Sequence, residues 1–151
     1  MEALIAYREK LVERLADAAR EFCSAYENGN PSRTLEGDWT RHQIAAHVRD
    51  VDRAVYGDRV RRTLREDNPL FESFDPEGWM AAHYNKDEPM QKILKEFKSS
   101  MDDLCETLKS SGQAAWSRAS RHQTMGEGLT LQLWVERSLA HIEEHLTFLK
   151  K

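Results

Sequence analysis

Apolar residues recur along four stretches of the chain at the spacing of one face of an α-helix. The first stretch runs from Glu2 to about Tyr26, with apolar positions at steps of three, four and seven and charged residues between them. An Asn-Gly-Asn-Pro run at 28–31 follows, and its residues are typical of a helix end. The pattern therefore predicts an amphipathic first helix.

The second helix is expected to begin with a side-chain cap. Thr40 and Gln43 have capping-box spacing, in which two side chains satisfy free backbone amides at a helix start. The apolar pattern then persists to about Leu64. Its inward face is predicted to hold Ile44, His47, Val48, Val51, Ala54 and Val55.

Two more helices are predicted after a long irregular connection. The period breaks between Leu64 and Pro89, where Asp75 and Pro76 can open a short helix that carries Trp79 to Tyr84. A third helix is expected from Pro89 to Leu108 and a fourth from about Thr130 to Leu149. No stretch shows the alternating pattern of a β-strand.

Four long amphipathic helices must bury their apolar stripes against one another. The sequence therefore predicts an all-α protein, a four-helix bundle formed by one domain over residues 1–151. The connection between the second and third helices is long enough to cross the bundle from end to end, so those helices can run parallel. Long crossovers of this kind often cover a functional site.

Composition narrows the class of protein. The chain has 151 residues, of which 40% are hydrophobic and 32% charged, and its formal net charge is −4. One domain fits this length. The small excess of acidic over basic residues argues against a nucleic-acid-binding surface. No apolar run approaches the roughly 20 residues that span a bilayer. The two cysteines form no CxxC pair. We therefore expect a cytoplasmic protein with neither nucleic acid nor membrane as partner.

The arginines of the second helix resemble a basic stripe until the neighbouring acidic residues are counted. Alternating signs are typical of a solvated helix face, and we predict one here. The arginines are Arg49, Arg53, Arg59, Arg61, Arg62 and Arg65, and the acidic residues are Asp50, Asp52, Asp58, Glu66 and Asp67.

Histidine placement carries most of the functional information. His47 lies on the inward stripe of the second helix, and His141 and His145 are separated by one helical turn on the fourth. Imidazoles among apolar side chains need partners for their ring nitrogens. Three of them can bind one divalent metal, with a fourth position open. A trio that is simply hydrogen-bonded in the core is the alternative. His42 and His122 are predicted to be exposed.

Other residues offer weaker signals. His141 to His145 also matches the HxxEH pattern of inverted zinc peptidases, but those enzymes need a larger mixed α/β domain. The candidates for a substrate pocket are His83, Trp79, Tyr84 and Trp39, because the crossover can cover the end of the bundle that bears the histidines.

Two segments resemble the DinB/YfiT-like superfamily. Trp39 precedes a capped helix with the run IAAHVRD at 44–50, which is similar to the second-helix signature of that superfamily. The run GLTL at 128–131, followed by AHIEEHL at 140–146, is similar to its last helix. The resemblance implies a four-helix bundle of unusual connectivity, often homodimeric, and places the metal ligands at His47, His141 and His145.

The resemblance also implies a range of chemistries. Related proteins include S-transferases that use bacillithiol and isomerases that use mycothiol. The expected cofactor is a divalent ion, zinc or nickel first and iron or manganese next, because imidazole suits zinc, nickel and iron(II) in particular. The expected partner is a small-molecule substrate, including a low-molecular-weight thiol.

Three functions remain open from the sequence. The first is a metal-dependent enzyme, a thiol S-transferase or a hydrolase, whose open metal position takes water or thiol. The second is a bundle that keeps its metal for structure or sensing. The third is a metal-free interaction module whose histidines are only packed.

Overall fold

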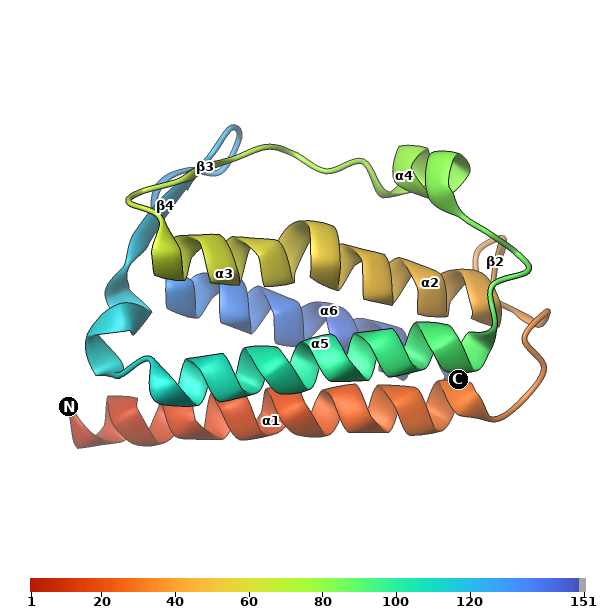
Figure 1. Ribbon diagram of the computed structural model, residues 1–151, viewed down its shortest axis with the longest axis horizontal. Helices are drawn as coiled ribbons and strands as arrows, with labels where there is room; N and C mark the ends of the chain where they lie inside the picture. Colours follow the sequence, from red (N-terminus) through yellow and green to blue (C-terminus); the bar gives the residue numbers. More distant parts are fainter. Residues whose placement is uncertain (150–151) are drawn as a thin grey trace.

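The computed structural model describes residues 1–149, and four long helical rods make up most of that part of the chain (Figure 1). The first rod is α1 (Glu2–Glu27) and the third is α5 (Met90–Ser110). The last is α6 (Leu131–Leu149). The second rod is composite, with α2 (Arg41–Val51), the π-helical segment η1 (Asp52–Tyr56) and α3 (Gly57–Arg65) end to end. The predicted four-helix bundle is confirmed.

The long connection sets the topology. Figure 1 shows α1 and α6 running in one direction, and the α2–α3 rod and α5 running in the other. The chain between α3 and α5 returns along the whole length of the bundle and carries β3 (Leu70–Phe71) and α4 (Pro76–His83). The second and third long helices are therefore parallel, as a connection of this length allows.

The core lies where the four rods meet. α1 packs against α5 and α6, and α2 packs against α5. Phe22 stacks on Tyr26 with ring centroids 4.1 Å apart and meets the edge of the Phe97 ring at 5.4 Å. The Thr40 side chain accepts a hydrogen bond from the backbone amide of Gln43, and the Gln43 side chain accepts one from the Thr40 amide, as the capping-box pattern predicts.

Short strands, which the sequence did not reveal, join the ends of the helices. β1 (Thr34–Glu36) pairs with β2 (Trp39–Thr40), and β4 (Ala119–His122) lies between β3 and β5 (Gly126–Thr130). A short 3₁₀-helix, η2 (Gln113–Ser117), precedes β4. The sequence shows no alternating pattern at these positions, because segments of two to five residues are too short to display one.

The crossover is anchored to α2 by buried polar groups. The Arg49 guanidinium lies 2.6 Å from a Glu88 carboxylate oxygen, 3.1 Å from Glu96 and 3.0 Å from Asp50. Arg49 holds the pKa of Glu88 down at about 2, against the opposing effect of burial. The Trp79 indole donates a hydrogen bond to the other Asp50 oxygen at 3.1 Å. These contacts fasten α4 and the start of α5 over α2.

Two predictions about exposed side chains are wrong for the same reason. Arg49 and Arg59 are buried, although the arginines of this helix were expected to be solvated, and His42 is buried as well. The nitrogens of the His42 ring lie 2.5 Å from the Tyr84 hydroxyl and 2.6 Å from the Glu88 carbonyl oxygen. The returning connection covers this side of the rod, and a helical pattern alone does not show which faces a later segment covers.

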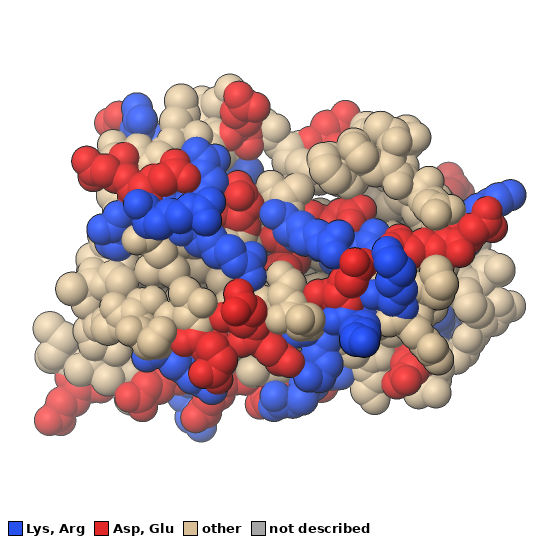
Figure 2. All heavy atoms as spheres, in the orientation of Figure 1, with Lys and Arg blue, Asp and Glu red and all other residues tan. Residues whose placement is uncertain are grey.

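Charges of both signs are interspersed on the face of the molecule shown in Figure 2. This mixture agrees with the near balance of basic and acidic residues in the sequence. Within residues 1–149, each helix is either too short or too polar to span a bilayer.

Candidate metal centre

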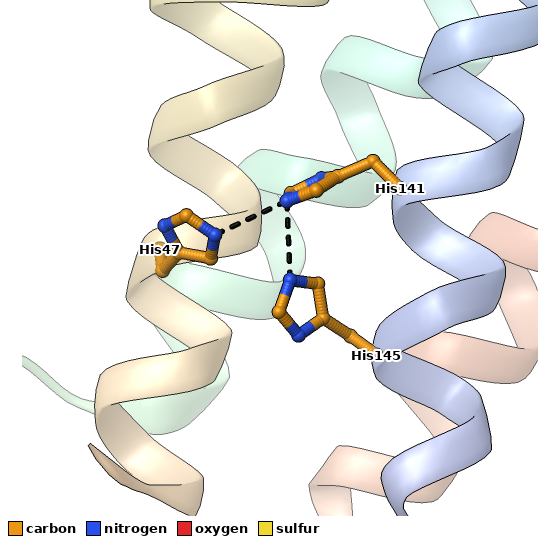
Figure 3. Close-up of side chains that lie close together, drawn as sticks. All are labelled: His47, His141 and His145. Carbon is orange, nitrogen blue, oxygen red and sulfur yellow. Dashed lines mark hydrogen bonds between the residues drawn. The ribbon is translucent and has the colours of Figure 1, made fainter. Parts of the chain in front are cut away.

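Three histidines from two rods point their rings at one another (Figure 3). His47 comes from α2, and His141 and His145 come from successive turns of α6. The Nε2 atom of His141 lies 3.1 Å from the Nε2 atoms of both other rings. One ring nitrogen from each residue lies within 4.8 Å of the others. The structure therefore brings together the three histidines that the sequence singled out.

The geometry of the three nitrogens suits a single metal ion. An ion with tetrahedral bonds of roughly 2.0–2.1 Å holds its ligand atoms about 3.3 Å apart. The two shorter separations observed, 3.1 Å each, are close to that value. Neutral imidazole nitrogen is also a preferred donor for zinc, nickel and iron(II). The donor set and these two separations are therefore suited to a divalent cation.

Glu36 determines which nitrogen of His145 is free. A Glu36 carboxylate oxygen lies 2.6 Å from His145 Nδ1, so this nitrogen carries the proton and donates it to the carboxylate. The lone pair of His145 is then on Nε2, which faces the other two rings. Carboxylate partners of this kind orient histidine ligands in metal sites. Glu36 lies on β1, in the segment between α1 and α2.

Burial keeps the other two rings neutral. The pKa of His47 is lowered to about 4 by burial and, to a smaller extent, by the neighbouring His145. The pKa of His141 is lowered to about 2 by burial first and then by His145 and His47. A cation needs unprotonated nitrogens, and these two imidazoles offer lone pairs at neutral pH.

Aromatic side chains hold the cluster in place. The edge of Trp39 packs against the His47 ring at a centroid distance of 4.9 Å. The Tyr56 ring, from the π-helical segment, lies 5.6 Å from the ring of His141. π-helical turns in longer helices are frequent at functional sites, and this one begins within two turns of His47.

The cluster forms part of the wall of a pocket of about 580 Å³. The α2–α3 rod and α6 form one side, the crossover residues 73–77 form another, and the turn between β4 and β5 forms a third. Its lining includes Trp39, Val51, Val55, Tyr56, Arg59, Phe74, His122, Met125 and Glu144. A pocket of this volume can hold a small organic molecule.

The candidates for the substrate pocket separate into two groups. Trp39 lines the pocket. Trp79, His83 and Tyr84 do not line the pocket, and their contacts are within the crossover and between the crossover and α2. Trp79 stacks on His83 with ring centroids 3.8 Å apart, and Tyr84 bonds to His42. These three residues hold the short helix α4 in place.

Sequence reasoning missed three residues of this region. Glu36 carries no local signal that separates it from the other acidic residues. Arg59 continues the inward stripe of Val48, Val51 and Val55 by one further turn, and this spacing is a signal that could have been used. His122, expected in solvent, is buried because β4 inserts it beside α6, with its ring centroid 6.4 Å from that of Trp134.

Comparison with known proteins identifies the family to which this chain belongs. YfiT from Bacillus subtilis, described as a probable metal-dependent hydrolase with an unusual four-helix bundle topology, matches the fold with a TM-score of 0.74. The match has 22% sequence identity and covers 91% of this chain and 84% of YfiT. A search of curated proteins found no match to the sequence. The sequence profile of the DinB superfamily matches residues 3–149. The chain therefore belongs to the DinB superfamily.

Proposed function

We propose that this protein is a metal-dependent hydrolase in which His47, His141 and His145 hold one divalent ion. The observation that carries the proposal is the meeting of three imidazoles at the wall of a pocket that can hold a small molecule. Zinc and nickel suit the nitrogen donors best, and iron and manganese are the next candidates.

The number of ligands favours a catalytic over a structural site. In residues 1–149, the group of potential ligands consists of the three histidines, without a fourth His, Cys, Asp or Glu. Structural zinc sites have four protein ligands, whereas catalytic sites have three and leave one position for water or substrate. The histidines also line the pocket, so the free position would face the space that a substrate occupies.

Protein side chains supply the rest of the chemistry. A bound divalent ion activates water at neutral pH and polarises a carbonyl group. Glu36 keeps the proton of His145 on Nδ1, away from the ion. Glu144 lies on α6 between His141 and His145 and lines the pocket, and we assign it to accept the proton of the attacking water. Glu143 turns away and pairs with Arg14 at 2.8 Å.

A thiol-dependent transfer is the competing reaction, and it would need a thiol from outside the chain. Cys23 and Cys105 lie on the bundle helices, and burial raises the pKa of each thiol to about 11. Neither is a thiolate at neutral pH. A low-molecular-weight thiol would therefore have to be the second substrate, which gives the two reactions different requirements in an assay.

Metal analysis of protein purified without a histidine tag tests the proposal. We expect about one divalent ion per chain, and a lower melting temperature after the ion is removed by chelator, because an ion bound to the folded state stabilises it. A panel of small amides and esters, assayed with and without added thiols, then separates hydrolysis from thiol transfer. Protein that contains no metal and cannot be reconstituted with zinc, nickel, iron or manganese would refute the proposal.

The contact between Glu36 and His145 leads to a second prediction. Glu36→Gln should weaken metal binding by roughly 10–100-fold, since the amide no longer accepts the Nδ1 proton with the strength of a carboxylate. Competition with a chromophoric chelator measures the affinity. Asp38→Asn, in the same hairpin but exposed, is the matched control and should bind metal as the wild type does. Equal affinity in both variants would show that Glu36 plays no part in the site.

A further inference from the structure

We infer that Arg59 is an anion-binding residue of the histidine pocket and that the substrate carries a carboxylate or phosphate group. The inference rests on the proposed function, because it concerns the substrate of the same site. Arg59 lines the pocket although only 7% of the residue is exposed.

No carboxylate pairs directly with the Arg59 guanidinium in the part of the chain that the structure describes. Among the described residues, the guanidinium makes one hydrogen bond, from Nη2 to the Glu72 carbonyl oxygen at 3.0 Å, and no ion pair. Arg49 is just as buried at 7% exposure, yet it contacts three carboxylates. A guanidinium carries five N–H donors, so Arg59 retains donors for a ligand. A buried cation without a counter-ion costs free energy, which an anionic ligand would offset.

Aromatic rings fix the position of the guanidinium. Its central carbon lies 4.8 Å from the centroid of Trp134, 5.8 Å from that of Phe71 and 5.9 Å from that of Tyr56. These contacts hold the planar group in place without neutralising it. A fixed planar fork of N–H donors is well matched to the two oxygens of a carboxylate or phosphate.

His122 adds a second donor to the same pocket. Its Nδ1 accepts hydrogen bonds from the backbone amides of Thr124 at 3.1 Å and Met125 at 3.3 Å, so the proton of the neutral ring is on Nε2. Its pKa is lowered by burial first and then by the positive charges of Arg59 and Arg137. The neutral ring of His122 therefore offers its Nε2 proton on the same pocket wall as Arg59.

The position of Arg59 relative to the histidines sets the shape of the substrate. Tyr56 neighbours both, since its ring is 5.6 Å from the ring of His141 and 5.9 Å from the Arg59 guanidinium carbon. Apolar side chains, including Val51, Val55 and Phe74, line the same pocket. The arrangement fits a compact molecule with an apolar body, an anionic group at Arg59 and its reacting bond at the histidines.

Titrations with benzoate, phenyl phosphate and benzamide test the inference. Benzamide has nearly the shape of benzoate but no charge, and the two anions distinguish a carboxylate from a phosphate. The titrations are followed by NMR on the indole N–H of Trp134, which lies beside Arg59, and are run on protein with zinc added and after treatment with chelator. We expect at least one anion to bind the chelator-treated protein at least tenfold more tightly than benzamide. Equal binding of the three compounds would overturn the inference.

Two variants show whether Arg59 is responsible. Arg59→Met should weaken binding of the preferred anion at least tenfold in the chelator-treated protein. Arg8→Met is the matched control, because Arg8 is also 7% exposed and lies 5.7 Å over a tryptophan ring, that of Trp116, but does not line this pocket. Unchanged anion binding in folded Arg59→Met would refute the inference. If Arg59→Met does not fold, the preference for anion over benzamide in the wild type decides.

The design separates this inference from the proposed function. Chelator-treated protein has no metal to attract the anion, so binding there reports on the side chains of the pocket, and the comparison with Arg59→Met isolates the contribution of Arg59. Failure of the protein to bind metal would refute the metal-dependent hydrolase and leave the anion titration interpretable. Loss of the anion preference, with metal binding retained, would refute only the role of Arg59.

Discussion

His141→Ala should abolish stable metal binding. His141 is the central residue of the cluster, because its Nε2 lies 3.1 Å from the Nε2 atoms of both His47 and His145. The variant leaves only His47 and His145 as imidazole ligands for the ion. We expect affinity to fall more than about 100-fold, since loss of an outer carboxylate partner alone costs roughly 10–100-fold. Metal analysis after gel filtration and chelator competition measure the change.

His83→Ala is the matched control for this experiment. His83 is also a helical histidine, but it is exposed on α4 and stacks on Trp79 outside the pocket. The control should retain about one ion per chain and the wild-type affinity for metal. If both variants keep their metal, the ion is held elsewhere, and the assignment of the three histidines is wrong.

Of the variants proposed here, Trp134→Ala should cause the largest decrease in the free energy of unfolding. The Trp134 side chain is fully buried, and its indole donates a hydrogen bond to the Ser120 hydroxyl at 2.7 Å. The ring also meets the edge of Phe71 at 5.7 Å. Removing it leaves a large cavity between α6 and the small sheet, which costs about 3–5 kcal/mol. Thermal unfolding followed by circular dichroism should show a decrease in melting temperature of roughly 10 °C.

Trp79→Ala gives the comparison for that prediction. Trp79 is only partly buried on α4, and its indole bonds to Asp50. Its loss should cost about 1 kcal/mol, typical of one hydrogen bond and partial apolar burial. Similar decreases in melting temperature for the two variants would show that Trp134 does not have the central packing role described here.

The bundle itself was predictable because its information is local. The stripe of the first helix and the Thr40 cap follow from residues close together in sequence, and the length of the crossover allowed the parallel arrangement that the structure has. The spacing of His141 and His145 likewise placed them on one face of α6. The resemblance to the DinB superfamily agrees with the profile match over residues 3–149. A homodimer, a thiol partner and a cytoplasmic location stay predictions.

The predictions of exposed side chains are wrong where a segment distant in sequence covers a helix. The faces that carry His42 and Arg49 look polar and solvated in the sequence, but the crossover encloses both side chains. Burial by a segment tens of residues away leaves no periodic signal, so helical patterns do not reveal it. The short strands escaped notice for a related reason, since their pairing depends on partners far along the chain.

The sequence by itself determined which residues form helices, which faces of those helices are apolar, and that three histidines lie on such faces. These properties depend on neighbours within one or two turns, and the helical period records them. The tertiary structure alone decided that Glu36 meets His145 and that the Arg59 charge, held among aromatic rings without a carboxylate, shares a pocket with the histidines. Such contacts join residues remote in sequence, and they form only when the crossover and the terminal loops fold onto the bundle.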